Sequence, residues 1–106
     1  MVSDEASWTF LTNHAHVMLC ISRDGDARLR DIAMLVGITE RAVQKIVTDL
    51  VANDYLTVER VGRRNRYRIQ LRKPLRHPLE RNHRIGELLE VLQDAPARRM
   101  TGPARR

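Results

Sequence analysis

The chain has 106 residues, of which 42% are hydrophobic and 4% aromatic, and its net charge is +6. This length supports a single domain core, and the shortage of aromatic side chains favours an aliphatic, mainly helical core. No apolar run approaches the ~18 residues of a membrane span, and the first residues, MVSDEAS, lack a signal-peptide pattern. Because Cys20 is the only cysteine, no internal disulfide forms, and we expect a cytoplasmic protein.

The basic residues are concentrated in one segment. Residues 1–55 have a net charge of −3, residues 56–76 of +7 and residues 77–106 of +2. In the middle segment Glu59 is the only acidic residue. An arginine-rich loop that merely aids solubility would not need such clustering, so the pattern favours a surface that binds a polyanion.

The sequence predicts a flexible N-terminus at 1–6 and then a first helix from a Ser7 cap to about Ser22. Helical spacing gives this helix two apolar stripes on opposite sides. The first, which we expect to cover the rest of the domain, comprises Leu11, Ala15, Met18 and Leu19. The second, which we expect to face a partner subunit or a later helix, comprises Phe10, Val17 and Ile21, with His14 beside them.

A turn and a second helix follow. Gly25 is expected to adopt a positive φ in the turn, and 27–29 could form a short strand. The second helix is predicted at 30–36, where Ala33 is small enough for another helix to cross closely. Gly37 is the expected left-handed terminator. The apolar residues expected to be buried here are Ile32, Leu35, Val36 and Ile38.

The third helix is predicted to begin after an N-cap at Thr39, with Glu40 in its first turn. Its buried stripe comprises Val43, Ile46, Val47 and Leu50. The opposite face comprises Glu40, Arg41, Gln44, Lys45 and Thr48. These residue types hydrogen-bond base edges and phosphates, although an ordinary solvated helix face has a similar composition. The close-packing turn before the helix favours a helix-turn-helix that lies in the DNA major groove.

After Asn53 the hydrophobic period changes from helical to alternating, which predicts a β-hairpin. Leu56 and Val58 share one side of the first strand, and the second strand aligns Tyr67, Ile69 and Leu71. The turn is placed at 61–66, with Gly62 or Asn65 in an unusual conformation. Arg63, Arg64 and Arg66 lie at or near this tip, where arginine could enter a narrow minor groove.

A last helix is predicted from Pro78 to about Gln93. Its apolar residues are Ile85, Leu88, Leu89 and Leu92, with Leu79 near the start. Gly86 inside it costs ~1 kcal/mol relative to alanine, so the helix needs a partner. We therefore expect 77–94 to be a dimerisation element, and 95–106 to be a disordered basic tail.

The order helix, helix, turn, helix, basic hairpin, helix resembles the winged helix-turn-helix transcription regulators of the MarR/ArsR-like group. The resemblance covers about residues 7–72, and the stretch NDYLTVERVGRRNRYRI resembles the passage from recognition helix to wing. The turn residues that carry it are Ile32, Ala33, Val36, Gly37, Ile38, Val43 and Ile46. It implies a mainly α fold with a small β-hairpin (α+β), with a winged helix-turn-helix domain at 7–76.

The resemblance also implies a homodimer that binds double-stranded DNA. The recognition helix, about 39–53, would enter the major groove through Thr39, Arg41, Gln44, Lys45 and Thr48. The wing, 61–66, would contact the backbone or minor groove through Arg63, Arg64 and Arg66. The interface set is Phe10, His14, Val17, Ile21, Ile85, Leu88, Leu89 and Leu92. Repression is favoured over activation because a bound protein blocks polymerase without a further surface. The chain is shorter than typical MarR-type regulators, which weakens the case for a pocket that binds a small molecule. A small-molecule effector is therefore possible but not indicated.

The sequence also bears on three other classes of protein. His16 and Cys20 have the i, i+4 spacing of metal ligands and His14 is nearby, but no carboxylate or second cysteine in that segment completes a set. No metal site is therefore predicted, and a metal-responsive regulator stays an alternative. No phosphate-binding loop, nucleophile elbow or metalloprotease pair is present, so neither an enzyme nor a cofactor is predicted. A winged helix that binds protein or RNA stays open, because fold does not determine function.

Overall fold

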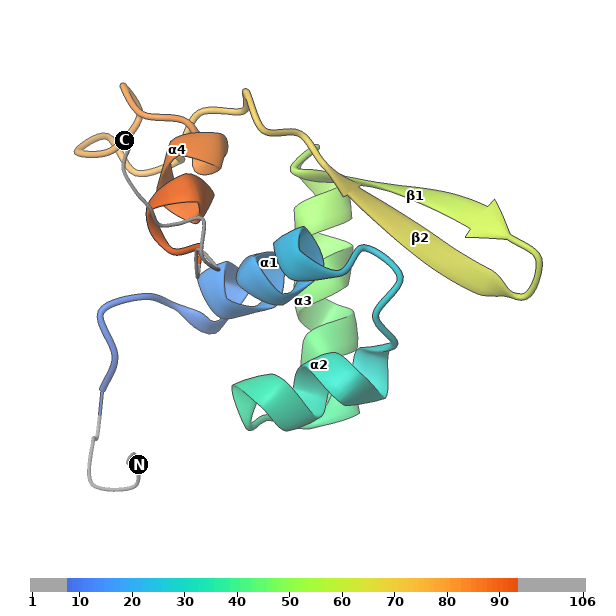
Figure 1. Ribbon diagram of the computed structural model, residues 1–106. Helices are drawn as coiled ribbons and strands as arrows, with labels where there is room; N and C mark the ends of the chain where they lie inside the picture. Colours follow the sequence, from blue (N-terminus) through green and yellow to red (C-terminus); the bar gives the residue numbers. More distant parts are fainter. Residues whose placement is uncertain (1–7, 94–106) are drawn as a thin grey trace. The chain divides into compact units, whose positions relative to one another are not determined.

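The computed structural model describes residues 8–93, and this part of the chain is a mixed α+β fold with four helices and one antiparallel hairpin (Figure 1). The chain divides into two compact units, with the boundary between Gln70 and Leu71. The first unit holds α1, α2, α3 and both strands, and the second holds α4. The predicted α+β class is therefore confirmed. The expected N-terminal extension, 1–6, and basic tail, 95–106, lie outside the described residues.

Helix α1 spans Asn13–Arg23, so the predicted start at Ser7 is wrong. The cap is Thr12, whose hydroxyl accepts a hydrogen bond from the Ala15 amide at 3.3 Å. Ser7 itself lies outside the described residues. A capping hydroxyl satisfies one of the free amides of the first turn, so the helix begins where that hydroxyl is available rather than where the apolar pattern begins.

Helix α2 spans Leu29–Val36 and buries Ile32 and Ala33. It starts directly after the α1–α2 loop, so the expected short strand at 27–29 is absent from the structure of that segment. Leu35 was predicted to be buried but is 76% exposed, beside the equally exposed Met34. The helix is only eight residues long, and its inner face is narrower than the predicted stripe.

Gly37 ends α2 in the left-handed conformation, with a φ of 87°, as predicted. The amides of Gly37 and Ile38 both donate to the Ala33 carbonyl, at 2.8 and 3.1 Å. Helix α3, Glu40–Ala52, then begins with the predicted Thr39 cap, whose hydroxyl accepts from the Ala42 amide at 3.0 Å. Two helix ends are thus closed within three residues, which fixes the angle between α2 and α3.

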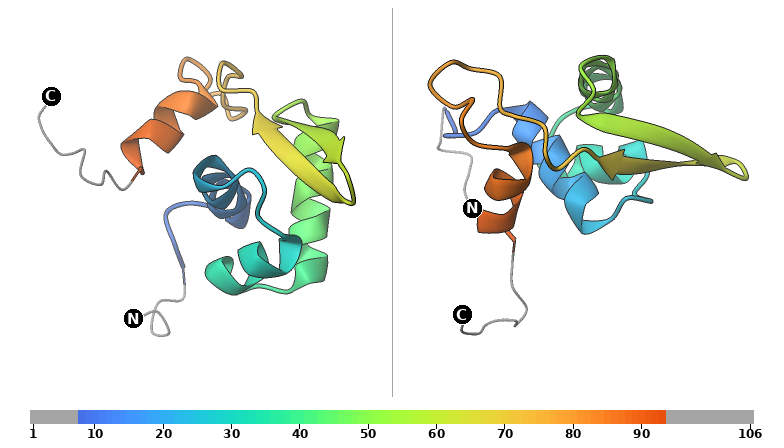
Figure 2. Two further views of the ribbon diagram at one scale, coloured as in Figure 1. Left: turned by 45° about the vertical axis from the view of Figure 1, so that its right-hand side comes forward. Right: turned by 90° about the horizontal axis from the view of Figure 1, so that it is seen from above.

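Residues from α1, α2, α3 and both strands make the core of the first unit, which is aliphatic apart from Tyr55 and Tyr67. All four members of the predicted α3 stripe are buried: Val43, Ile46, Val47 and Leu50. The largest side chains that solvent does not reach are Met18, Ile32, Leu56, Val17 and Val43. Figure 2 shows the three helices crossing one another around this core. The aliphatic character of the core agrees with the composition.

Strands β1, Leu56–Val61, and β2, Arg64–Ile69, pair antiparallel with Val61 opposite Arg64. The turn is therefore the two residues Gly62 and Arg63, tighter than the predicted 61–66. Gly62 has a φ of 64° and Arg63 has a negative φ, the arrangement of a II′ turn with glycine first. The hairpin starts near the C-terminal end of α3 and projects away from the helices (Figure 1).

The α1–α2 loop runs along the free edge of β2. The Tyr67 amide donates to the Gly25 carbonyl at 3.0 Å, and a Cβ on Gly25 would lie 2.8 Å from the backbone carbonyl oxygen of Tyr67. Gly25 does not have the predicted positive φ, which among the described glycines occurs only at Gly37 and Gly62. The glycine is required because two backbones approach closely, not because the turn needs a left-handed residue.

In the second unit, α4 covers only Ile85–Val91, half of the predicted 78–93 helix. The preceding residues form turns, with the Glu80 amide bonded to the His77 carbonyl at 2.8 Å. They also fold back on 73–75, since the Leu75 amide donates to the His83 carbonyl at 2.9 Å. Arg84 provides no side-chain cap. Leu71, predicted on the second strand, lies outside it and is 55% exposed.

Gly86 lets α4 approach the start of its unit. Its amide donates to the Leu71 carbonyl at 2.9 Å, and the Ile85 amide donates to the Lys73 carbonyl at 2.9 Å. A Cβ on Gly86 would meet the Leu71 oxygen at 2.8 Å. The glycine that weakens the helix therefore permits the hydrogen bonds that hold it. Among the described residues no helix is both long and apolar enough to cross a membrane.

Candidate nucleic-acid interface

The outer face of α3 is exposed along its whole length, because the opposite stripe fixes the helix against the core. The exposed residues are those predicted from the sequence: Thr39, Glu40, Arg41, Gln44, Lys45 and Thr48. This face presents one carboxylate, two cationic side chains, one amide and two hydroxyls from the cap and consecutive turns of one helix. It therefore offers both charge-assisted and neutral hydrogen-bond donors to a ligand.

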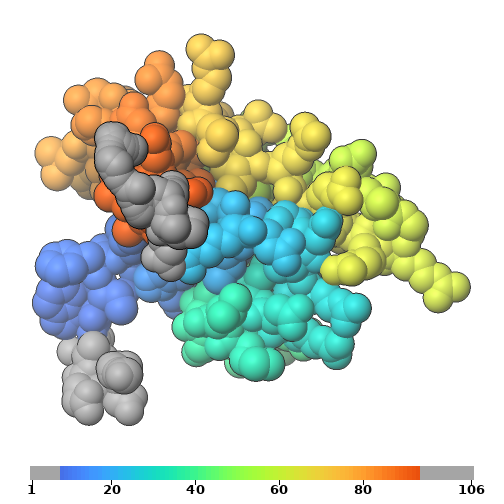
Figure 3. Space-filling model, in the orientation of Figure 1, coloured from blue at the N-terminus to red at the C-terminus, as the bar shows by residue number. Residues whose placement is uncertain are grey.

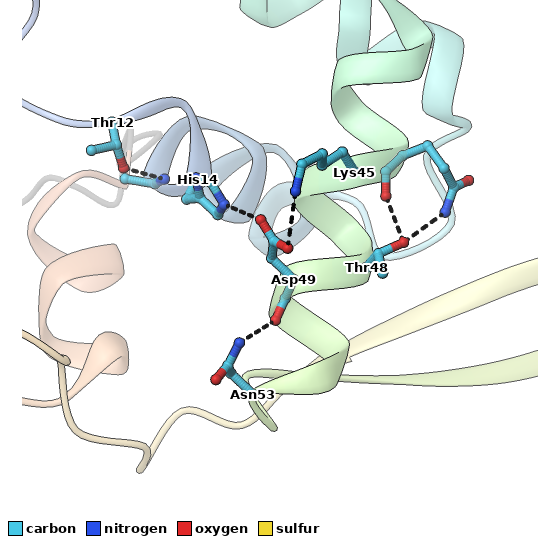
Figure 4. A network of polar contacts seen from close by, with 8 residues as sticks. Thr12, His14, Lys45, Thr48, Asp49 and Asn53 are labelled. Carbon is cyan, nitrogen blue, oxygen red and sulfur yellow. Dashed lines mark hydrogen bonds and ion pairs between the residues drawn. The ribbon is translucent and has the colours of Figure 1, made fainter.

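Gln44 and Thr48 are joined one turn apart. The Gln44 Nε2 donates to Thr48 Oγ1 at 3.3 Å, and Thr48 Oγ1 donates to the backbone carbonyl of Gln44 at 2.9 Å. Figure 4 shows Thr48 on one edge of α3 and Asp49 on the other. Within residues 8–93 the side-chain oxygen Oε1 of Gln44 and one hydrogen of its Nε2 have no other partner, so the side chain is oriented while it keeps one donor and one acceptor.

Asp49 is an acidic residue on α3 that the sequence analysis did not assign. Its Oδ2 lies 2.9 Å from His14 Nε2 of α1, and its Oδ1 lies 3.6 Å from Lys45 Nζ (Figure 4). The hydrogen bond to His14 and the nearby charges of Lys45 and His14 lower the pKa of Asp49 below its usual range, against a smaller opposing effect of burial. Lys45 keeps a side chain that is 77% exposed, so this contact does not withdraw it from solvent.

The hairpin register decides which arginines share a face. Arg64 pairs with Val61, Arg66 with Glu59 and Arg68 with Thr57. Because side chains alternate across a strand, all three arginines lie on the same face of β2. Arg68 was not among the predicted contacts, although its i, i+2, i+4 spacing from Arg64 and Arg66 was a signal for it. Arg60 on β1 was also missed, and its Nε donates to the Gly62 carbonyl at 3.1 Å.

Two hairpin arginines contact the α1–α2 loop. Arg66 Nε lies 2.9 Å from Asp26 Oδ1, and Arg64 Nη2 donates to the Asp26 backbone oxygen at 2.6 Å. The hydrogen bond from Arg66 is the main cause that lowers the pKa of Asp26, and the same bond raises the pKa of Arg66. No local pattern could reveal these contacts, since the partners are 38 and 40 residues apart in sequence. Arg63 is one of the two turn residues at the tip of the hairpin, whose yellow-green end protrudes at the right of Figure 3.

Half of the predicted interface set does not present a free surface. Val17, Ile21, Ile85 and Leu89 are 0%, 3%, 6% and 2% exposed. Val17 and Ile21 are thus covered within their own chain, which is one of the two alternatives expected for that stripe, and the dimer interface stays a prediction. His14 bonds to Asp49 of the same chain. Leu88 and Leu92 are half-buried.

Phe10 is the exception, at 92% exposed. It packs edge-to-face on Trp8, with the ring centroids 4.9 Å apart, and Trp8 is 66% exposed. This aromatic pair precedes α1 and was not predicted as a pair.

The residues considered for a metal do not gather. His16 Nδ1 lies 3.1 Å from Asn13 Oδ1, and burial raises the pKa of the half-buried Cys20 thiol. Across residues 8–93 no group of three or more histidine, cysteine, aspartate or glutamate side chains is placed to hold a metal ion.

No protein-family model matches this chain, and no curated protein sequence matches it.

Proposed function

We propose that the chain is a winged-helix transcription regulator that binds double-stranded DNA. In this reading α2, the turn at Gly37 and α3 form the helix-turn-helix, and β1 and β2 form the wing. The proposal rests on the polar outer face of α3 together with the exposed, arginine-rich hairpin of the same unit. A major groove about 12 Å wide admits an α-helix, and α3 is held by its buried stripe so that only this face is free.

The side chains on α3 suit different parts of a duplex. Arg41 has the fork of donors that pairs with the O6 and N7 of guanine, and Gln44 has the amide that pairs with adenine. Lys45 is suited to phosphate, as a flexible point charge. The capped N-terminus of α3 at Thr39 adds a partial positive charge that favours phosphate.

We further propose that two copies act together on a two-fold DNA site and repress transcription by blocking polymerase. The surfaces that support a homodimer are the exposed Trp8–Phe10 pair and the half-buried Leu88 and Leu92. Sedimentation equilibrium of the unaltered protein tests this part separately from DNA binding.

The decisive experiment is binding of the unaltered chain to duplex DNA over a salt titration, followed by selection from a random duplex library. Log affinity should fall linearly with log salt, because arginines and Lys45 displace the counterions of the phosphates. Duplex RNA and single-stranded DNA serve as competitors, and stronger binding to either would replace the proposal with an RNA or single-strand module. Absence of duplex binding at low salt would refute it.

Substitutions then separate base contacts from phosphate contacts. Arg41→Ala and Gln44→Ala should each change preference at one position of the selected site, by about 1–3 kcal/mol. Lys45→Ala should weaken binding to all sequences alike. Arg81→Ala is the matched control, since it removes an exposed arginine from the other unit. An equal effect of Arg41→Ala on every sequence would assign that residue to the backbone instead.

A further inference from the structure

Asp26 is the only residue in the described part of the chain whose side chain forms an ion pair with a hairpin arginine. Its carboxylate takes the Nε hydrogen of Arg66 at 2.9 Å, and its carbonyl takes an Nη2 hydrogen of Arg64 at 2.6 Å. A carboxylate oxygen accepts the same charge-assisted hydrogen bond that a phosphate oxygen would accept. Asp26 therefore occupies donors that the proposed function would direct at DNA.

The backbone fixes this carboxylate in place. The Asp26 amide donates to Asp24 Oδ1 at 3.0 Å, and the Ala27 amide donates to the Asp24 carbonyl at 3.1 Å. On the other side, the Gly25 carbonyl holds the Tyr67 amide at the β2 edge. Because these hydrogen bonds keep Asp26 next to Arg66, little further conformational entropy of the loop is lost when the ion pair forms.

The three predicted wing arginines are thus in unequal positions. Arg64 bonds to a backbone oxygen, which no substitution at position 26 removes. Arg66 bonds to a side chain and also faces Glu59 across the hairpin. Arg63, at the tip, has no hydrogen bond or ion pair to another described residue, so its five guanidinium donors are free for a ligand.

We propose that Asp26 is an internal counter-ion that competes with DNA phosphate for Arg66, so that Arg66 contributes less to duplex binding than Arg63 does. Asp26 is then a positioning residue that limits sequence-independent affinity. The inference rests on the proposed DNA-binding function and concerns the regulation of that site. Neutralising Asp26 would release Arg66 toward phosphate, while Arg64 would keep its backbone partner.

The salt dependence of duplex binding measures the number of phosphates that the protein neutralises. Each neutralised phosphate contributes about 0.9 to the magnitude of the slope of log affinity against log salt. Arg63→Ala should reduce this slope by about 0.9, whereas Arg66→Ala should change it little. Asp26→Asn should raise affinity for all sequences and steepen the slope by about 0.9. The double variant D26N/R66A should return the slope to that of the unaltered chain. Asp31→Asn, the same charge change at an exposed position on α2, should leave the slope unchanged.

Either of two results would overturn the inference: an equal loss of slope for Arg66→Ala and Arg63→Ala, or no steepening for Asp26→Asn. Should Asp26→Asn unfold, as judged by circular dichroism, the comparison of Arg63→Ala with Arg66→Ala decides alone. If the unaltered chain fails to bind duplex DNA at low salt, the proposed function is refuted and the inference with it. Slopes that contradict it in a protein that does bind remove only the inference.

Discussion

Helices α3 and α4 carry the same kind of apolar repeat in the sequence, yet only α3 has the predicted length. Helix α3 runs over Glu40–Ala52, and α4 stops at Ile85–Val91 although its pattern extends back to Leu79. Helix α3 buries all four residues of its stripe, whereas in the last predicted helix Ile85 and Leu89 are buried and Leu88 and Leu92 are half-buried. Periodicity therefore identified all the buried stripe residues of α3 and half of those predicted for α4, and it located the ends of only one of the two helices.

The ends differ in how their backbone groups are satisfied. Thr39 supplies a hydroxyl to the first turn of α3, whereas Arg84 supplies no side-chain cap to α4. The residues before α4 instead give their hydrogen bonds to turns and to 73–75. A segment with another partner for its amides gains little from joining a helix, so an apolar repeat continues only where no such partner competes.

The largest effect that tests this comparison is expected at Gly86. Helix propensity alone predicts that Gly86→Ala stabilises the chain by ~1 kcal/mol. The structure predicts the opposite sign, a loss of about 1–3 kcal/mol, because the new Cβ would lie 2.8 Å from the Leu71 oxygen. Urea unfolding followed by circular dichroism measures the difference. A more stable Gly86→Ala protein would show that α4 does not depend on its close approach to Leu71.

A smaller effect is expected at the cap of α3. Thr39→Ala should destabilise the chain by about 1 kcal/mol, because the Ala42 amide loses its hydroxyl partner. Thr39→Ser keeps the oxygen and is the matched control, and Arg84→Ala at the uncapped start of α4 should have a lesser effect. The same unfolding experiment applies. Equal losses for Thr39→Ala and Arg84→Ala would mean that capping does not distinguish the two helices.

The smallest effect concerns one histidine–carboxylate pair on each helix. Asp49 of α3 bonds to His14 of α1, whereas Glu87 of α4 bonds to His83 one turn before it, at 2.6 Å. These hydrogen bonds lower the pKa of both carboxyls below their ordinary values of 3.8 and 4.5. A lowered pKa in the folded state stabilises the fold above the unfolded pKa, and this contribution is lost as the pH falls through the folded pKa.

Thermal unfolding between about pH 5 and about pH 2 measures this loss. With Asp49→Asn the melting temperature should fall less as the pH is lowered, because the contact between positions 14 and 49 no longer depends on an ionised carboxyl. Glu87→Gln, which removes a contact within one turn, should reduce this fall by a smaller amount. A larger effect of Glu87→Gln would show that the local pair is the stronger one.

The sequence predicted much of the candidate interface because its signals are local. The α3 stripe, the Thr39 cap and the left-handed Gly37 each depend on residues a few positions apart, and all three are confirmed. The exposed polar face of α3 follows from the same stripe. The arginines of the hairpin were recognised by composition, but the turn was placed too broadly, and Arg60 and Arg68 were missed.

The errors arose where a distant segment competes for a residue. Gly25 has no left-handed conformation and instead makes room for the backbone of Tyr67. Leu35 was counted as buried because its spacing fits, although α2 turns it toward solvent. Each of these outcomes depends on which elements lie side by side, and helical spacing contains no such information.

The sequence by itself determined the α+β composition, the buried stripe of α3, the caps around Gly37 and the concentration of positive charge after residue 55. Hydrophobic periodicity and capping operate within about one or two helical turns, which is why single-sequence patterns capture them. Only the tertiary structure decided that Asp26 binds Arg66 and that Asp49 joins α3 to α1. It also decided that Gly86 lies against the backbone of Leu71 in a helix shorter than predicted. Those decisions rest on hydrogen bonds and steric limits between residues that are far apart in sequence. For the proposed interface, the sequence determines that the hairpin carries arginines, and the tertiary structure determines which of those arginines already have a partner within the chain.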